Sequence, residues 1–333
     1  MTSLQETQHQ GCEDFFSALP PEMRLEILKQ TTLQDIRHLI SASPALLRTF
    51  RRHRASLLRH HMQELLQVYG DERILPFVAF TMDLRALRAK SQHLTPSELE
   101  EKLKPALNSI ESQECIRQPT TGYLDLPTLE KAQNLVPELC LAYRHHQEKH
   151  HTLTQRPRSH FLLEKAPCYH KLRFIEGFLR FDCYCNMFWY RNKSLFSTLN
   201  DVKTKFSSPF LHHPDPSVER FPNTIISTIC KGYRDRINQL HLPLLPRHLD
   251  PVDTPENWTL RRDKFLDQCV FPEAAYFLHL LIGGYPRFAM LKSLTAEEFE
   301  RYIHEDFYQF ITANPKAGQW INQWFRDHDL RWW

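Results

Sequence analysis

The sequence predicts an all-α fold, in which an N-terminal three-helix module is followed by a larger, irregular helical body. Only 8 of the 333 residues are glycine, which disfavours propellers, dinucleotide-binding folds and hairpin-rich architectures, because their tight turns need glycine. The 22 prolines are numerous enough to separate many helices. Apolar side chains recur at helical spacing in several segments, and two later segments begin with a helix-capping signature.

The N-terminal module is expected over residues 13–62. Pro20 and Pro21 suit the first turn of a helix, where a missing N–H group does no harm. Ser43 directly precedes Pro44, which is a cap followed by a first-turn proline at the start of the third helix. Apolar residues at helical spacing define the three helices in turn: Met23, Ile27 and Leu28; Leu33, Ile36, Leu39 and Ile40; Leu47, Phe50, Leu57, Leu58 and Met62.

The helical body is expected over residues 63–333 and contains the two capping signatures. Each places a threonine before the helix and a glutamate three residues later, and they begin at Thr95 and Thr295. A further helix is predicted over 128–148, where Pro137 should kink or split it.

The clearest apolar stripe of the chain predicts a central buried helix in this body. The stripe consists of Phe174, Phe178, Phe181, Cys185 and Phe188. Two stretches, 207–222 and 241–257, are expected to be loops, and the polar residues 1–12 are expected to form a flexible tail.

Charge and cysteine usage favour an intracellular protein, in the cytoplasm or nucleus. The net charge is only +3, which is low for a dedicated nucleic-acid-binding protein. The N-terminus has no apolar signal core, and no run approaches the roughly 18 apolar residues of a membrane span. We therefore expect the eight scattered cysteines to be free thiols, and we expect no membrane association.

Enzyme motifs are absent from the sequence, so we expect no catalytic residue, no cofactor and no metal. His146 and His150 have the spacing of a metal pair, but the glutamate of a zinc-protease motif is one position late, and a solvated helix end is the favoured interpretation. Cys183 and Cys185 would diverge by roughly 200° on a helix, so Cys185 is interpreted as a buried thiol rather than a ligand.

Two other features have simple structural interpretations. Pro243 and Pro246 form a PxxP pattern beside Arg247, which proline-rich loops produce by chance. Aromatic residues gather near the C-terminus, and we expect them to pack on the body. They are Trp320, Trp324, Phe325, Trp332 and Trp333. For the last two, the alternative is that they stay exposed and bind a partner.

Five arginines lie in the third helix of the module: Arg48, Arg51, Arg52, Arg54 and Arg59. Such a cluster can bind phosphates, and a nucleic-acid grip is one alternative. Leucines and a phenylalanine between the arginines form a continuous apolar face, so the helix must also pack against something. We therefore interpret the arginines as a hydrated face whose stems cover apolar surface, with neutralisation available from Glu22, Glu26 and Asp35.

The module resembles the F-box motif, in the variant common in proteins of filamentous fungi. The resemblance rests on Leu-Pro-Pro-Glu-Met at 19–23, Ile-Leu at 27–28, Asp-Ile at 35–36 and Leu-Ile at 39–40. The continuation ISASPALLRTFRRHRASLL is similar to the third helix of that variant. The later block RFIEGFLRFDCYCNMF, at 173–188, is similar to an internal helix of the same fungal proteins.

The resemblance implies a substrate receptor of a cullin–RING ubiquitin ligase, with no catalytic residue of its own. The module would dock on a Skp-type adaptor, and the body would bind an unknown target protein. The implied adaptor-binding residues are Leu19, Pro20, Glu22, Met23, Ile27, Leu28, Ile36 and Leu39. Most are apolar, and together they exceed what so small a module can bury internally. The alternative is an interaction or structural protein with a vestigial F-box and no ubiquitin role.

Overall fold

The computed structural model describes residues 14–112, 125–151, 162–191, 193–196, 223–237, 239–240 and 272–313. The predicted tail, both predicted loops, the PxxP pattern and the C-terminal tryptophans lie outside these residues.

The all-α prediction is confirmed, since 86% of the described residues are helical. The elements are η1 (Phe15–Ala18), α1 (Pro21–Gln30), α2 (Leu33–Ala42), α3 (Pro44–Tyr69), η2 (Glu72–Ile74), α4 (Leu75–Lys90), α5 (Pro96–Glu111), α6 (Leu126–His151), η5 (Leu163–Lys165), α7 (Cys168–Phe188), β1 (Trp189–Tyr190), β2 (Lys193–Ser194), α9 (Asn223–Ile237), α11 (Pro272–Ile282), α12 (Gly284–Ser293) and α13 (Ala296–Ala313). The two short strands pair antiparallel, with Trp189 opposite Ser194. None of the described helices is long and apolar enough to cross a membrane.

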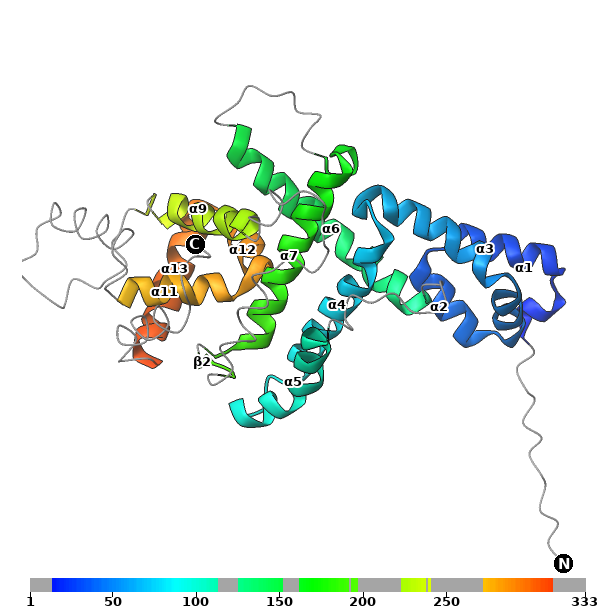
Figure 1. Cartoon of the computed structure of the whole chain (residues 1–333), viewed down its shortest axis with the longest axis horizontal. Coiled ribbons are helices and arrows are strands. Elements are labelled where there is room, and N and C mark those ends of the chain that lie inside the picture. Colours follow the sequence, from blue (N-terminus) through cyan, green and yellow to red (C-terminus); the bar gives the residue numbers. More distant parts are fainter. Residues whose placement is uncertain are drawn as a thin grey trace, which may run out of the picture.

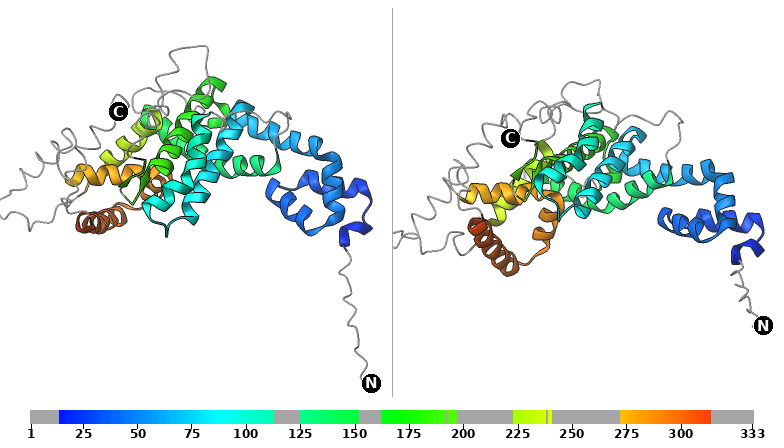
Figure 2. Two further views of the ribbon diagram at one scale, coloured as in Figure 1. Left: turned by 60° about the horizontal axis from the view of Figure 1, so that its bottom comes forward. Right: turned by 90° about the horizontal axis from the view of Figure 1, so that it is seen from below.

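The described part of the chain is elongated, with the first three helices at one end (Figures 1 and 2). Helix α1 packs on α3, whereas α2 packs on both α3 and α6. An ion pair of 2.9 Å between Arg37 of α2 and Glu130 of α6 joins this module to the body.

Helix α3 runs without a break through the predicted boundary at residue 62. Its last turns belong to the body, because Leu65, Val68 and Tyr69 are buried there. The Tyr69 hydroxyl donates a hydrogen bond of 2.7 Å to the carbonyl oxygen of Ala132 in α6. Module and body therefore share one helix.

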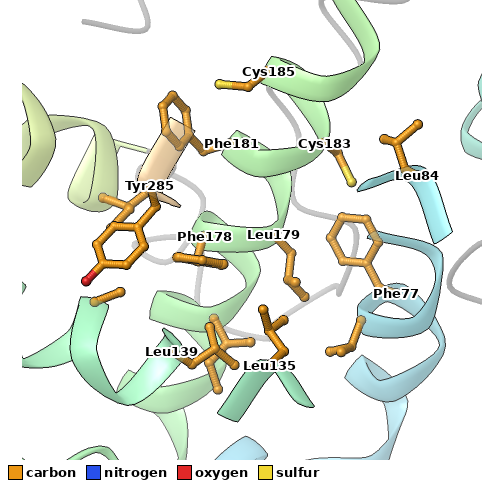
Figure 3. Packing of buried hydrophobic residues seen from close by; sticks show 14 of the residues in the cluster. Phe77, Leu84, Leu135, Leu139, Phe178, Leu179, Phe181, Cys183, Cys185 and Tyr285 are labelled. Carbon is orange, nitrogen blue, oxygen red and sulfur yellow. The ribbon is translucent and has the colours of Figure 1, made fainter. Parts of the chain in front are cut away.

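Helix α7 is the centre of the body, as the phenylalanine stripe predicts. It packs on α4, α6, α9 and α12. Phe178 and Phe181 lie on the side of α7 that faces Tyr285 of α12 (Figure 3). Leu179 and Cys183 lie on the side that faces Phe77 and helix α4. The rings of Phe178 and Tyr285 meet edge to face, with their centroids 5.5 Å apart.

The polar side of α7 is buried as well, which the stripe does not predict. Asp182 is held by two hydrogen bonds from Arg85 of α4, of 2.7 and 2.8 Å, and the same guanidinium binds Glu138 of α6 through two bonds of 2.7 Å. Burial alone would lower the pKa of Arg85, but the hydrogen bonds that its guanidinium donates to Glu138 and the charge of Asp182 raise it instead. This network allows three charged groups to lie between α4, α6 and α7.

Local sequence signals place the other helices. Thr95 caps α5 in a complete capping box, and Thr295 makes the same reciprocal hydrogen bonds with Glu298 before α13. Helix α6 is not split at Pro137. The proline is solvent-exposed, and the helix continues although one backbone hydrogen bond is missing there.

Candidate docking surface on the N-terminal module

The start of the module is fixed by the side chain of Asp14. It accepts hydrogen bonds from the N–H group of Phe16 (3.1 Å), the N–H group of Ala45 (3.0 Å) and the hydroxyl of Ser43 (2.8 and 2.9 Å). The bond from Ala45 is the main reason that the pKa of Asp14 is lowered. The segment before α1 is thereby held against the junction of α2 and α3.

Caps and prolines then set where each helix of the module begins. Pro20 and Pro21 open α1, the hydroxyl of Thr32 caps α2, and the hydroxyl of Ser43 caps α3 by accepting a bond of 3.1 Å from the N–H group of Leu46. Extended backbone at each cap turns the chain between helices. These signals are local in the sequence, and the helix starts follow them.

The eight predicted adaptor-binding residues do not all lie at the surface. Leu28 and Ile36 are 0% exposed and belong to the core of the module, so in this structure they support the surface from inside and cannot contact a partner. Leu39 is half-buried and packs against the same core. The module is so small that α1 and α2 must each bury one apolar face against α3.

The remaining predicted residues are accessible. Met23 is 54% exposed, Pro20 and Glu22 are exposed, and Leu19 and Ile27 are half-buried. Met23 and Ile27 are four residues apart, so they share one side of α1.

Phe15 is an exposed aromatic residue that the sequence interpretation missed. Its side chain is 75% exposed, while the adjacent Phe16 packs against the core. The two rings meet edge to face with centroids 5.8 Å apart. The available signal was the pair of adjacent phenylalanines two residues before the Leu-Pro motif, since a single short turn cannot bury both.

We name Phe15, Leu19, Pro20, Met23 and Ile27 the docking surface. These residues come from η1, the turn after it and α1, and α1 lies at the end of the molecule away from the body (Figures 1 and 2). Phe15, Pro20 and Met23 are exposed and the other two are half-buried, and apolar side chains left accessible in this way are typical of a surface that a partner covers.

The five arginines of α3 are all exposed, which confirms the hydrated face that the sequence predicts. The expected neutralising acids form no direct ion pairs with these arginines in the described part of the chain. Within the described part of the chain, Glu26 pairs with Lys29 of its own helix, and Asp35 accepts a bond from the Thr32 hydroxyl. No ion pair joins any of the five arginines to Glu22, Glu26 or Asp35 in these residues.

Among the described residues, no group of three or more His, Cys, Asp or Glu side chains is placed to hold a metal ion. Cys183 and Cys185 are both buried, as predicted for Cys185. His146 is not part of a solvated helix end. It is buried, its Nδ1 lies 3.1 Å from the Thr228 hydroxyl, and its ring stacks on Phe174. The side chain of His150 lies outside the described part of the chain.

Comparisons of the chain with protein-family models, with curated proteins and with solved structures gave no match.

Proposed function

We propose that this chain is a substrate-receptor subunit of a cullin–RING ubiquitin ligase. The F-box-like module docks on a Skp-type adaptor through the docking surface, and the helical body binds a target protein. In this role the chain acts inside the cell, in the cytoplasm or nucleus, and catalyses no reaction itself.

One observation supports the proposal above the others, namely that the described part of the body leaves the docking surface accessible. Helix α1 turns one side to α3 and leaves Met23 more than half exposed, and Phe15 is exposed still further. If the module served only to pack on its own body, this apolar side would be covered. The module contacts the body through α2, where Arg37 forms an ion pair with Glu130 of α6.

The direct test is binding of the full chain to a purified Skp-type adaptor from a filamentous fungus. We expect wild type to bind and Met23→Asp to weaken binding at least about tenfold, because a charge would be placed in an apolar contact. Met290→Asp is the matched control, since Met290 is an exposed methionine (42%) on α12 of the body, and it should bind as wild type does.

Two further sets of variants separate the apolar surface from the basic one. Leu19→Asp and Ile27→Asp should abolish adaptor binding, provided that their circular dichroism shows an intact fold. The triple variant Arg48→Gln, Arg52→Gln, Arg59→Gln should bind almost as wild type does. If the triple variant loses binding while the aspartate variants keep it, the module uses the opposite face and the docking surface is wrong.

Failure of the wild-type chain to bind any adaptor would instead favour the alternative, an interaction protein with a vestigial F-box. Adaptor and cullin recovered together with the chain from fungal extract would favour the ligase.

A further inference from the structure

A cavity of about 320 Å³ lies in the body, where the C-terminal ends of α4 and α7 meet strand β1 and the turn between α11 and α12. Its volume is at the lower end of the range for small-molecule sites. Four arginines line it, Arg85, Arg88, Arg191 and Arg287, together with a single carboxylate, Asp182.

Two of these arginines are neutralised by acids. Arg85 binds both Asp182 and Glu138, as described above. Arg287 pairs with Asp306 of α13 at 2.6 Å, and it also contacts the ring of His279 at 2.9 Å. These two side chains have their counter-charges within the protein.

Arg88 and Arg191 have no such partner among the described residues. The only hydrogen bonds they form there go to backbone carbonyl oxygens, from Arg88 to Trp189 at 2.7 Å and from Arg191 to Gln92 at 2.6 Å. Nη1 of Arg88 is buried and has no hydrogen-bond partner in the same part of the chain. Burial accordingly lowers the pKa of Arg88.

The guanidinium groups of Arg88 and Arg191, which have no carboxylate partner among the described residues, both lie over the ring of Tyr190. Their central carbons are 4.8 Å (Arg88) and 5.0 Å (Arg191) from the centroid of Tyr190, so the groups are within about 10 Å of each other. The Tyr190 hydroxyl is itself fixed by bonds to the carbonyl oxygens of Gln92 and Leu94. Two positive charges are thereby held beside one cavity, although each repels the other.

The backbone also contributes to this arrangement. Arg191 has a φ of 47°, in the left-handed region that non-glycine residues rarely adopt. Arg191 lies in the turn directly after β1. In this conformation its side chain folds back over the ring of Tyr190.

We propose that the cavity binds a small molecule that carries an oxyanion, a phosphate or a carboxylate, attached to an apolar group. Arg88 and Arg191 bind the oxyanion, because guanidinium groups match both chemistries with paired N–H donors. Trp189, Ile282 and Pro286 line the same cavity and contact the apolar group. This site is independent of the adaptor-docking function, since it lies in the body and not in the module.

The test is calorimetric titration of the full chain with phenyl phosphate, benzoate and inorganic phosphate. We expect phenyl phosphate or benzoate to bind, with an affinity that falls as NaCl is raised. The stronger of the two identifies the oxyanion, and inorganic phosphate should bind more weakly because it lacks the apolar group.

Variants then assign the binding to the two arginines. Arg88→Gln and Arg191→Gln should each weaken binding by about tenfold or more, since each removes a charged hydrogen-bond donor. Arg59→Gln, an exposed arginine of α3, should bind as wild type does. Arg191 is itself exposed, so Arg191→Gln should remain folded even if Arg88→Gln does not.

Two results would overturn the proposal. One is the absence of binding by all three probes up to about 10 mM. The other is unchanged affinity in a folded Arg191→Gln variant.

Discussion

Truncation of Phe178 to alanine measures how much the central helix contributes to the stability of the body. The side chain is 1% exposed, and it packs edge to face against Tyr285 with 5.5 Å between centroids. Removing a buried phenylalanine typically costs about 3–5 kcal/mol, which includes the cavity that remains. An edge-to-face pair accounts for about 0.5–1.5 kcal/mol of such a loss. Because the guanidinium of Arg85 also lies 6.0 Å from this ring, we expect a value in the upper half of the range.

Urea unfolding followed by circular dichroism provides the measurement, with the slope of the transition checked for each variant. Phe15→Ala is the matched control, because it is the same truncation at a side chain that is 75% exposed. It should change the free energy of unfolding by no more than about 0.5 kcal/mol. A loss below about 1 kcal/mol for Phe178→Ala, or equal losses for the two variants, would refute the assignment of α7 to the core.

Further predictions concern the charges, caps and thiols. Arg85→Met should destabilise the protein by about 3–5 kcal/mol, because it leaves Asp182 buried without its partner, and adding Asp182→Asn should recover part of the loss in urea unfolding. Thr95→Ala should cost about 1 kcal/mol through loss of the α5 cap, and a variant as stable as wild type would contradict the cap. The pKa of Asp14 is lowered, chiefly by the N–H group of Ala45, so its contribution is complete above about pH 4 and is lost as the pH falls through the lowered value. The melting temperature of Asp14→Asn should therefore lie below that of wild type at about pH 7 and approach it near pH 2, and a constant difference would argue against this linkage. Thiol titration of the denatured, unreduced protein should find all eight cysteines, and a shortfall of two would indicate a disulfide.

The helices could be predicted from the sequence because their signals are local. A threonine cap with a glutamate three residues later begins α5, and the spacing of Phe174, Phe178 and Phe181 is a property of one short segment. The same applies to Ser43 and Pro44 at the start of α3. Each of these signals operates within about one turn of helix, so no knowledge of the rest of the fold is needed.

Features that depend on distant partners could not be predicted. Asp182 is buried because Arg85, 97 residues earlier, binds it, and His146 is buried because Thr228, 82 residues later, contacts its ring. The division of the predicted adaptor-binding residues into buried and exposed ones has the same origin. Leu28 and Met23 are both apolar residues of α1, and only the position of α3 decides that Leu28 is covered and Met23 is not.

Helix α3 continues from the module into the body. Its length therefore sets the rotation of the docking surface about the α3 axis, relative to the body. A helix advances about 1.5 Å and turns about 100° for each residue. One extra residue in the largely exposed stretch 51–56 would leave every side chain of the docking surface intact but would rotate this surface by roughly 100° about the helix axis. The ion pair of Arg37 with Glu130 would have to break at the same time. In the proposed complex, the orientation of the adaptor relative to the body therefore depends on the length of α3, independently of the chemistry of the surface itself.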